Sequence, residues 1–237
     1  MTNKEQKWPS RIVIVRHGES ERNVAKASTK SGASTHSFGL GLRDMDTPLT
    51  KRGLGQARET GAALAKRYRF DTVFSSPFRR AFQTSDCILS HLNPQPPIVL
   101  EERIREIEFG ILDGLTKEGI KKRYPEEHAR REREGKYWYR PPGGESRPDV
   151  ALRVHSFLGT LTRDYRGKNV LIVCHSVVVL VFRHLLERWS EDQYLRVDRE
   201  EDVLNCSVTA YRYERHARKL ALECYNETYY SDGKRRG

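Results

Sequence analysis

The chain has 237 residues, and its 43 Lys and Arg residues against 32 Asp and Glu residues give a formal net charge of +11. This length suits one large domain or two small ones, with a core that needs no disulfide or metal ion to hold it together. The composition excludes collagen-like and disulfide-rich proteins, and an aromatic content of 9% argues against wholesale disorder.

Neither membrane insertion nor secretion is indicated. The longest apolar run, Val177 to Phe182, is far shorter than the roughly 20 residues that a membrane-spanning helix needs. Residues 1–7 are polar and lack the apolar centre of a secretion signal, so we expect a cytoplasmic protein with no membrane partner. The four cysteines are too widely spaced for a zinc-binding pattern, which favours reduced thiols.

Short apolar runs without alternation predict strands that are buried on both faces, as in a parallel sheet. Ile12 to Val15 and Val170 to Cys174 show this pattern most clearly. Further strands are predicted at residues 71–74, 98–100, 209–213 and 220–224, the last two as an antiparallel pair.

Helical patterns alternate with these strands, at residues 49–68, 78–92, 146–161 and 177–186. Thr50 is placed to cap the first helix, and Ser146 forms a capping-box pattern with Asp149 at the start of the third. The alternation predicts an α/β fold, a three-layer αβα sandwich with a mainly parallel central sheet and an antiparallel edge strand. We expect a single domain over residues 1–237.

Two stretches depart from this alternation. Residues 26–44 are rich in Ser, Thr and Gly and have no apolar period, which predicts a long polar loop that is either functional or disordered. Residues 117–140 are basic and partly helical, and we interpret them as an insertion over the edge of the sheet. Because loops on a rigid scaffold carry specificity, both stretches are expected to wall a ligand pocket.

Chemistry-bearing side chains follow three of the predicted strands. Two strands end directly in a histidine, His17 and His175, and a third leads through a short turn to Arg79 and Arg80. Ligands of open α/β sheets bind beyond the carboxyl ends of the strands, so these groups are expected to converge. A helix that begins after His175 would add its N-terminal N–H groups. A lone histidine after a strand is usually a packed residue, but two of them beside an arginine predict an anion site.

Five ordered segments resemble the histidine phosphatase superfamily, in its phosphoglycerate-mutase-like branch. They are Arg16-His17-Gly18-Glu19-Ser20 with Asn23, Ser75-Ser76-Pro77-Phe78-Arg79-Arg80-Ala81, Ile104-Arg105-Glu106, Gly143-Gly144-Glu145-Ser146 and Val173-Cys174-His175-Ser176. The stretch Asp46-Thr47-Pro48-Leu49-Thr50, with Gly53 and Gln56, is similar to the family's approach to its first long helix. The resemblance covers most of the chain and implies the phosphoglycerate-mutase-like fold.

The resemblance also implies roles for individual residues. His17 is the nucleophile that forms a phosphohistidine, and Glu106 is the general acid and then the general base. The implied phosphate and substrate contacts are Arg16, Arg80, His175, Asn23 and Ser176. Forked arginine donors suit the charge and shape of a phosphoryl group, and a neutral imidazole exists near neutral pH. No metal ion or other cofactor is needed on this interpretation.

The family contains both hydrolases and mutases. Ile107-Glu108-Phe109-Gly110 follows the proposed acid and resembles the phosphatase members, whereas the glycolytic mutases usually carry Arg-His-Tyr-Gly there. Against this, Arg130-Arg131 and the segment Tyr137 to Arg140 lie where mutases keep contacts to the substrate carboxylate. We favour a broad-specificity acid phosphatase acting on a small phosphorylated metabolite, with a phosphoglycerate-type mutase as the alternative.

A third hypothesis is a non-catalytic basic binding protein. The net charge and the Lys234-Arg235-Arg236 tail would suit nucleic acid, but no recognition motif for DNA or RNA is present, so no specific nucleic-acid partner is expected. An intact catalytic set would then be unexplained. An exposed edge strand leaves a homodimer open. Arg140, beside three aromatic residues, is a candidate contact for the leaving group.

Overall fold

The computed structural model describes residues 6–30 and 36–231 and contains a six-stranded sheet in the order β3-β2-β4-β1-β5-β6. The strands are β1 (Arg11–Arg16), β2 (Thr72–Ser75), β3 (Ile98–Leu100), β4 (Asn169–Cys174), β5 (Val208–Glu214) and β6 (Lys219–Glu227). β3, β2, β4 and β1 are parallel, whereas β5 is antiparallel to both β1 and β6. This mixed sheet confirms the predicted fold class.

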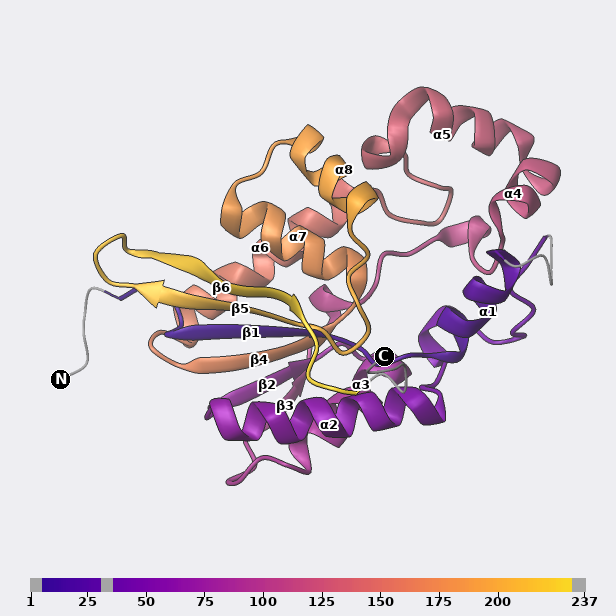
Figure 1. Cartoon of the computed structure of the whole chain (residues 1–237). Coiled ribbons are helices and arrows are strands. Elements are labelled where there is room, and N and C mark those ends of the chain that lie inside the picture. The colour runs from indigo at the N-terminus through magenta and orange to yellow at the C-terminus, as the bar shows by residue number, and fades with distance from the viewer. Residues whose placement is uncertain (1–5, 31–35, 232–237) are drawn as a thin grey trace.

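Helices cover both faces of the sheet (Figure 1). They are α1 (Glu21–Lys30), α2 (Lys51–Arg67), α3 (Arg79–Leu89), α4 (Lys117–Arg123), α5 (Pro125–Trp138), α6 (Arg147–Asp164), α7 (Ser176–Glu187) and α8 (Glu191–Glu200). Short 3₁₀ turns are η1 (Asp44–Asp46), η2 (Glu102–Ile104) and η3 (Gly110–Leu112). Helices α2 and α3 lie on one side of the sheet, and α6 and α7 lie on the other.

The buried strand β1 shows why the sheet is covered twice. Ile12 and Ile14 pack in a cluster with residues of α6 and α7, whereas Val13 and Val15 pack in a second cluster with residues of α2 and α3. Successive side chains of a strand point to opposite faces, so an unbroken apolar run is stable only when both faces are covered. All four side chains are fully buried, which ties β1 firmly to the centre of the fold.

The predicted helix starts are confirmed. The Thr50 side chain accepts a hydrogen bond from the Gly53 N–H at the start of α2. Ser146 and Asp149 form a reciprocal capping box at the start of α6. Each cap satisfies backbone N–H groups that have no partner inside the helix.

Residues 26–44 are not a continuous loop, which corrects the prediction for the part of that stretch inside the described residues. Helix α1 extends to Lys30, and η1 begins at Asp44. Ser28 and Thr29 donate to the carbonyls of Val24 and Lys26, so their hydroxyls are satisfied within the helix. Residues 31–35 of this stretch, and the basic tail at 234–236, lie outside the described residues.

The basic stretch at residues 117–140 is mostly helical, as α4 and α5. Gly135 adopts a φ of 80° inside α5 and interrupts its helical backbone. Helix α8 was not predicted, because its sequence is largely charged and only Tyr194 is buried. No helix in the described parts of the chain has both the length and the apolar character to span a membrane.

Candidate active site

The two strand-terminal histidines meet at the carboxyl ends of β1 and β4. The His17 N–H donates to the Cys174 carbonyl at 2.9 Å, and the centroids of the His17 and His175 rings are 5.1 Å apart. Both side chains are buried. Parallel pairing of the two strands therefore brings together residues that are far apart in the sequence, as the pattern predicted.

The ring of His17 is held in one tautomer. Its Nδ1 lies 2.7 Å from the Gly18 carbonyl oxygen, which can only accept, so Nδ1 carries the proton. Nε2 accepts a hydrogen bond from Arg80 Nε at 3.2 Å. Burial, and then the charges of Arg80 and Arg16, hold the pKa of His17 well below its usual 6.5. His17 thus presents a neutral imidazole with the lone pair of Nε2 directed at a cation.

Arg80 is fixed at the start of α3 by a buried carboxylate. Its Nη1 and Nη2 atoms donate to Asp44 Oδ1 and Oδ2 at 3.0 and 3.1 Å. Thr84 Oγ1 donates to the Arg80 carbonyl and accepts from the Gly18 N–H. The helix that carries the arginine is therefore hydrogen-bonded to the loop that carries the histidine.

Two buried side-chain nitrogen atoms beside His17 have no hydrogen-bond partner among the described residues. They are Arg16 Nε and His175 Nδ1. The other side of each group is anchored, because Arg16 Nη1 donates to the Val203 carbonyl and His175 Nε2 lies 2.8 Å from Ser76 Oγ. Buried polar atoms normally have partners. The Arg16 Nε–H group therefore suits an anionic ligand placed next to the His17 ring, and so does His175 in the tautomer that carries its proton on Nδ1.

Glu106 lies beside the same cluster, two residues after η2. Its Oε1 accepts from the Ile107 N–H at 3.0 Å, and Ser176 Oγ donates to its Oε2 at 3.4 Å. The side chain is buried, and this burial raises its pKa, while the charges of Arg80 and Arg16 act in the opposite direction. A raised pKa favours the protonated carboxyl, which is the form that donates a proton.

Close backbone packing holds the loop after His17. An added Cβ at Gly53 would lie 2.0 Å from the Glu19 carbonyl oxygen, and one at Gly18 would lie 2.6 Å from the Gly53 carbonyl oxygen. The Gln56 side chain accepts a hydrogen bond from the Glu19 N–H. The loop is therefore pressed directly against the first turn of α2.

The other predicted site residues, Asn23, Ser176 and Arg140, lie at different distances from the cluster around His17. Asn23 Oδ1 accepts from the Ser20 N–H and from Asn205 Nδ2, so it braces the loop beneath His17. Ser176 contacts Glu106, as described above. Arg140 is exposed and forms an ion pair with Asp149. The sequence prediction missed Asp44 and Asn205, the latter donating to the His17 carbonyl.

A cavity of about 890 Å³ adjoins this cluster, walled by α1, the residues around η3, α4 and α5. Arg22, which pairs with Asp44, and Ile107, which follows Glu106, connect its lining to the cluster around His17. The ionisable side chains of the lining are Arg22, Lys26, Lys117, His128, Arg131, Lys136, Arg147, Glu118, Glu132 and Glu145. Stretches 26–44 and 117–140 both contribute, as predicted, but Arg140 does not.

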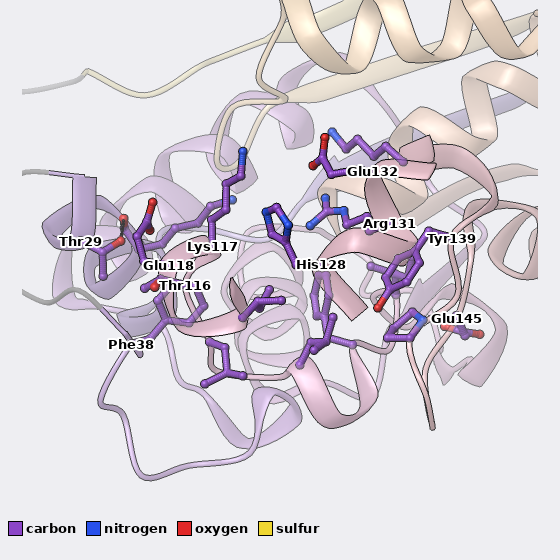
Figure 2. Close-up of a pocket in the computed structure, with 18 of the residues that line it drawn as sticks. Thr29, Phe38, Thr116, Lys117, Glu118, His128, Arg131, Glu132, Tyr139 and Glu145 are labelled. Atoms are coloured by element: carbon purple, nitrogen blue, oxygen red, sulfur yellow. Dashed lines mark hydrogen bonds between the residues drawn. The ribbon is translucent and has the colours of Figure 1, made fainter. Parts of the chain in front are cut away.

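Part of this lining is cationic. Figure 2 shows Lys117 of α4 and His128 and Arg131 of α5 around the cavity. Arg147 Nε and His128 Nε2 are buried and have no hydrogen-bond partner among the described residues. Burial, and then the neighbouring charge of Arg147, lower the pKa of Arg131. Two like charges that are kept close together favour a negatively charged ligand.

Comparisons with known proteins agree with the fold. A family model described as the histidine phosphatase superfamily (branch 1) matches residues 12–227. The chain is 35% identical over 193 residues to the 2,3-bisphosphoglycerate-dependent phosphoglycerate mutase of Methylobacterium radiotolerans, covering 78% of this chain and 84% of the relative.

Solved structures of phosphatases are also similar. A mycobacterial glucosyl-3-phosphoglycerate phosphatase complexed with VO3 has a TM-score of 0.69 and 25% identity, covering 92% of this chain and 100% of that one. The α-ribazole phosphatase of Shigella flexneri has a TM-score of 0.74 over 92% of this chain and 96% of that one, and its 24% identity supports the fold alone. The similar proteins thus include both mutases and phosphatases.

Proposed function

The chain belongs to the histidine phosphatase superfamily, and we propose that it is a metal-independent phosphomonoesterase that transfers the phosphoryl group of a small substrate to His17 and then to water. The observation that carries this proposal is the neutral His17 ring, whose Nε2 faces Arg80. Beside it lie two buried nitrogens without a hydrogen-bond partner among the described residues, Arg16 Nε and His175 Nδ1. These groups suit the oxygens of a phosphoryl group.

The first step breaks the ester bond. Nε2 of His17 attacks phosphorus, the bond to the leaving oxygen breaks, and the carboxyl of Glu106 gives that oxygen its proton. The donors of Arg16, Arg80 and His175 offset the negative charge of the phosphoryl oxygens. They accelerate the reaction to the extent that they bind the transition state better than the substrate.

The second step restores the enzyme. The Glu106 carboxylate takes a proton from water, the water oxygen attacks phosphorus, and the bond to His17 breaks. Inorganic phosphate leaves with neutral His17 and protonated Glu106 in place, so protons and charges balance over the cycle. His17 needs no separate base, because its Nε2 is already unprotonated.

Hydrolysis is favoured over mutase activity by two paired arginines. Arg130 is held by Glu127 and Glu134, and Arg140 is held by Asp149. Two of the cations in the region where mutases bind the substrate carboxylate are therefore already neutralised. The sequence after Glu106 supports the same choice, because it resembles the phosphatase members.

The cavity supports a leaving group that carries its own negative charge, such as a carboxylate or a second phosphate. Arg131, and the buried nitrogens Arg147 Nε and His128 Nε2 that have no hydrogen-bond partner among the described residues, would bind that charge. The same feature keeps phosphoglycerate mutase activity as the second candidate function, since phosphoglycerates carry both a phosphate and a carboxylate.

The test is hydrolysis of p-nitrophenyl phosphate between about pH 4 and 8 with a chelator present. We expect turnover by the wild type and none by His17→Ala, while the control His155→Ala, at an exposed site on α6, keeps wild-type activity. A folded wild type without turnover would contradict the phosphatase. Incubation with 3-phosphoglycerate and a bisphosphate primer then distinguishes isomerisation from phosphate release.

A further inference from the structure

The guanidinium group of Arg80 has two edges that can each bind an anion. One edge consists of Nη1 and Nη2 and is filled by Asp44, with both carboxylate oxygens within 3.1 Å. The other edge consists of Nε and the second N–H of Nη2, and its Nε faces His17 Nε2 at 3.2 Å. Asp44 thus occupies only the edge that points away from the nucleophile.

Asp44 also forms an ion pair with a second arginine, Arg22. Arg22 Nε lies 3.1 Å from Asp44 Oδ1, and Arg22 Nη2 lies 2.6 Å from Asp113 Oδ1. The Arg22 guanidinium also lies 5.2 Å from the centroid of the Phe38 ring and 5.7 Å from that of Phe109. The result is a partly buried row of alternating charges from Asp113 to Arg80, in which the carboxylate of Asp44 lies between two arginines.

We propose that Asp44 is a positioning residue, which holds the Nη edge of Arg80 so that the Nε edge stays aligned with the phosphoryl group on His17. The inference rests on the proposed function, because it concerns the same reaction. Arginine has several rotatable bonds, and its guanidinium can meet an anion with either edge. With its Nη edge already bonded to Asp44, Arg80 has one edge left for a phosphoryl group beside His17.

A competing role for Asp44 would be to block the site. A blocking carboxylate must occupy the donors that the substrate uses, and it must leave when the substrate binds. Asp44 instead does not contact the edge nearest His17, where Arg80 Nε donates to His17 Nε2, and Arg22 retains Asp44 independently of Arg80. Removal of a blocking residue would raise activity, whereas removal of a positioning residue lowers it, so the two roles predict opposite results.

The decisive variant is Asp44→Asn, which preserves shape but removes the charge and turns one N–H donor toward the N–H groups of Arg80. Asp46→Asn is the matched control, because Asp46 lies in the same 3₁₀ turn and pairs only with the exposed Arg43. Asp44→Glu is the second variant, since it keeps the charge and shifts the carboxylate by one methylene. Thermal unfolding of each variant establishes that it is folded.

We expect Asp44→Asn to lower kcat for p-nitrophenyl phosphate by about tenfold to a hundredfold, because misplacement of one group by about 1 Å has effects of this size. Asp44→Glu should fall between this variant and the wild type. Asp46→Asn should behave as the wild type. An Asp44→Asn protein with wild-type or higher kcat overturns the proposal, as does a loss confined to KM.

Calorimetric titration with inorganic phosphate separates this inference from the proposed function, because it needs no turnover. We expect the wild type and Asp46→Asn to bind phosphate, and Asp44→Asn to bind it about tenfold more weakly, since a charged hydrogen bond contributes about that factor. If the wild type binds phosphate but does not hydrolyse the ester, only the proposed function fails. Equal phosphate affinity in Asp44→Asn and the wild type rejects the role of Asp44.

Discussion

Arg16 and Cys174 are register partners on the parallel strands β1 and β4, and each is followed by one of the two site histidines. Since the strands are hydrogen-bonded neighbours at the centre of the sheet, the distance between His17 and His175 is set by strand pairing and not by the conformation of a loop. A site built on regular elements keeps its geometry when no ligand is bound.

Replacing Glu106 by Gln should affect substrates according to their leaving groups. An alkyl phosphate needs a proton on the departing oxygen, so its turnover should fall by about a hundredfold or more. The p-nitrophenolate ion departs without a proton, so its release in the first turnover should be much less affected. Stopped-flow absorbance measures the release of p-nitrophenolate, and an assay of phosphate release measures the turnover of the alkyl phosphate. Glu108→Gln, two residues along and exposed, is the control, and an equal loss for both substrates argues against general acid catalysis.

The pH dependence of kcat/KM follows from the same two groups. The pKa of His17 is well below 6.5, so the nucleophile stays neutral into the acidic range. The pKa of Glu106 is raised above its usual 4.5, so the general acid stays protonated at a higher pH than an ordinary carboxyl. Activity should fall as pH rises through the Glu106 pKa, which gives an acidic optimum with an alkyl phosphate, because the leaving oxygen of that substrate needs the proton of Glu106. Activity that increases steadily into the alkaline range would contradict these roles.

The two histidines should also make the fold sensitive to acid. Burial is the main cause that lowers the pKa of His17 and of His175 in the folded state, whereas in the unfolded chain each titrates near 6.5. Below that pH the unfolded state binds more protons, so the free energy of unfolding falls as pH decreases. The slope approaches about 1.4 kcal/mol per pH unit for each histidine. Urea unfolding of the wild type and of His175→Asn from pH 6.5 downward should show a shallower decline in the variant.

If the cavity binds a negative charge on the leaving group, Arg131→Ala should impair only substrates that carry such a charge. We expect kcat/KM for a substrate with a second anion, such as 3-phosphoglycerate, to fall about tenfold or more, the size expected for a charged hydrogen bond. Hydrolysis of p-nitrophenyl phosphate, which has no such group, should not change. Arg133→Ala is the control, since Arg133 is exposed on the same helix and does not line the cavity. Equal losses on both substrates would place Arg131 in support of the fold instead.

The sheet and the histidine pair were predictable because local patterns encode them. The unbroken apolar runs of β1 and β4 follow from burial on both faces, and the residue after each strand then lies at the ligand-binding edge. The Thr50 cap was predictable for a similar reason, because a hydroxyl before an apolar helical pattern satisfies a nearby N–H group.

Asp44 and Asn205 were not predictable in the same way. Asp44 lies in a polar stretch and is buried only because Arg80, 36 residues later in the chain, folds against it. Asn205 reaches the His17 carbonyl across 188 residues of sequence. Helix α1 was also missed, because its Ser and Thr residues have low helix propensity, and the hydrogen bonds from Ser28 and Thr29 back to carbonyls of the same helix do not show in the sequence.

The packing of α2 against the loop after His17 limits which substitutions the fold tolerates in this helix. At position 53 any side chain would collide with backbone atoms of Glu19, which cannot swing aside as a flexible side chain does. Gly55 lies two residues further along α2, and an added Cβ there has nothing within 4 Å. Alanine at position 55 should therefore stabilise the helix by about 1 kcal/mol. A mutational library over α2 should therefore retain only glycine at 53 while accepting many residues at 55, although neither position carries a reacting group.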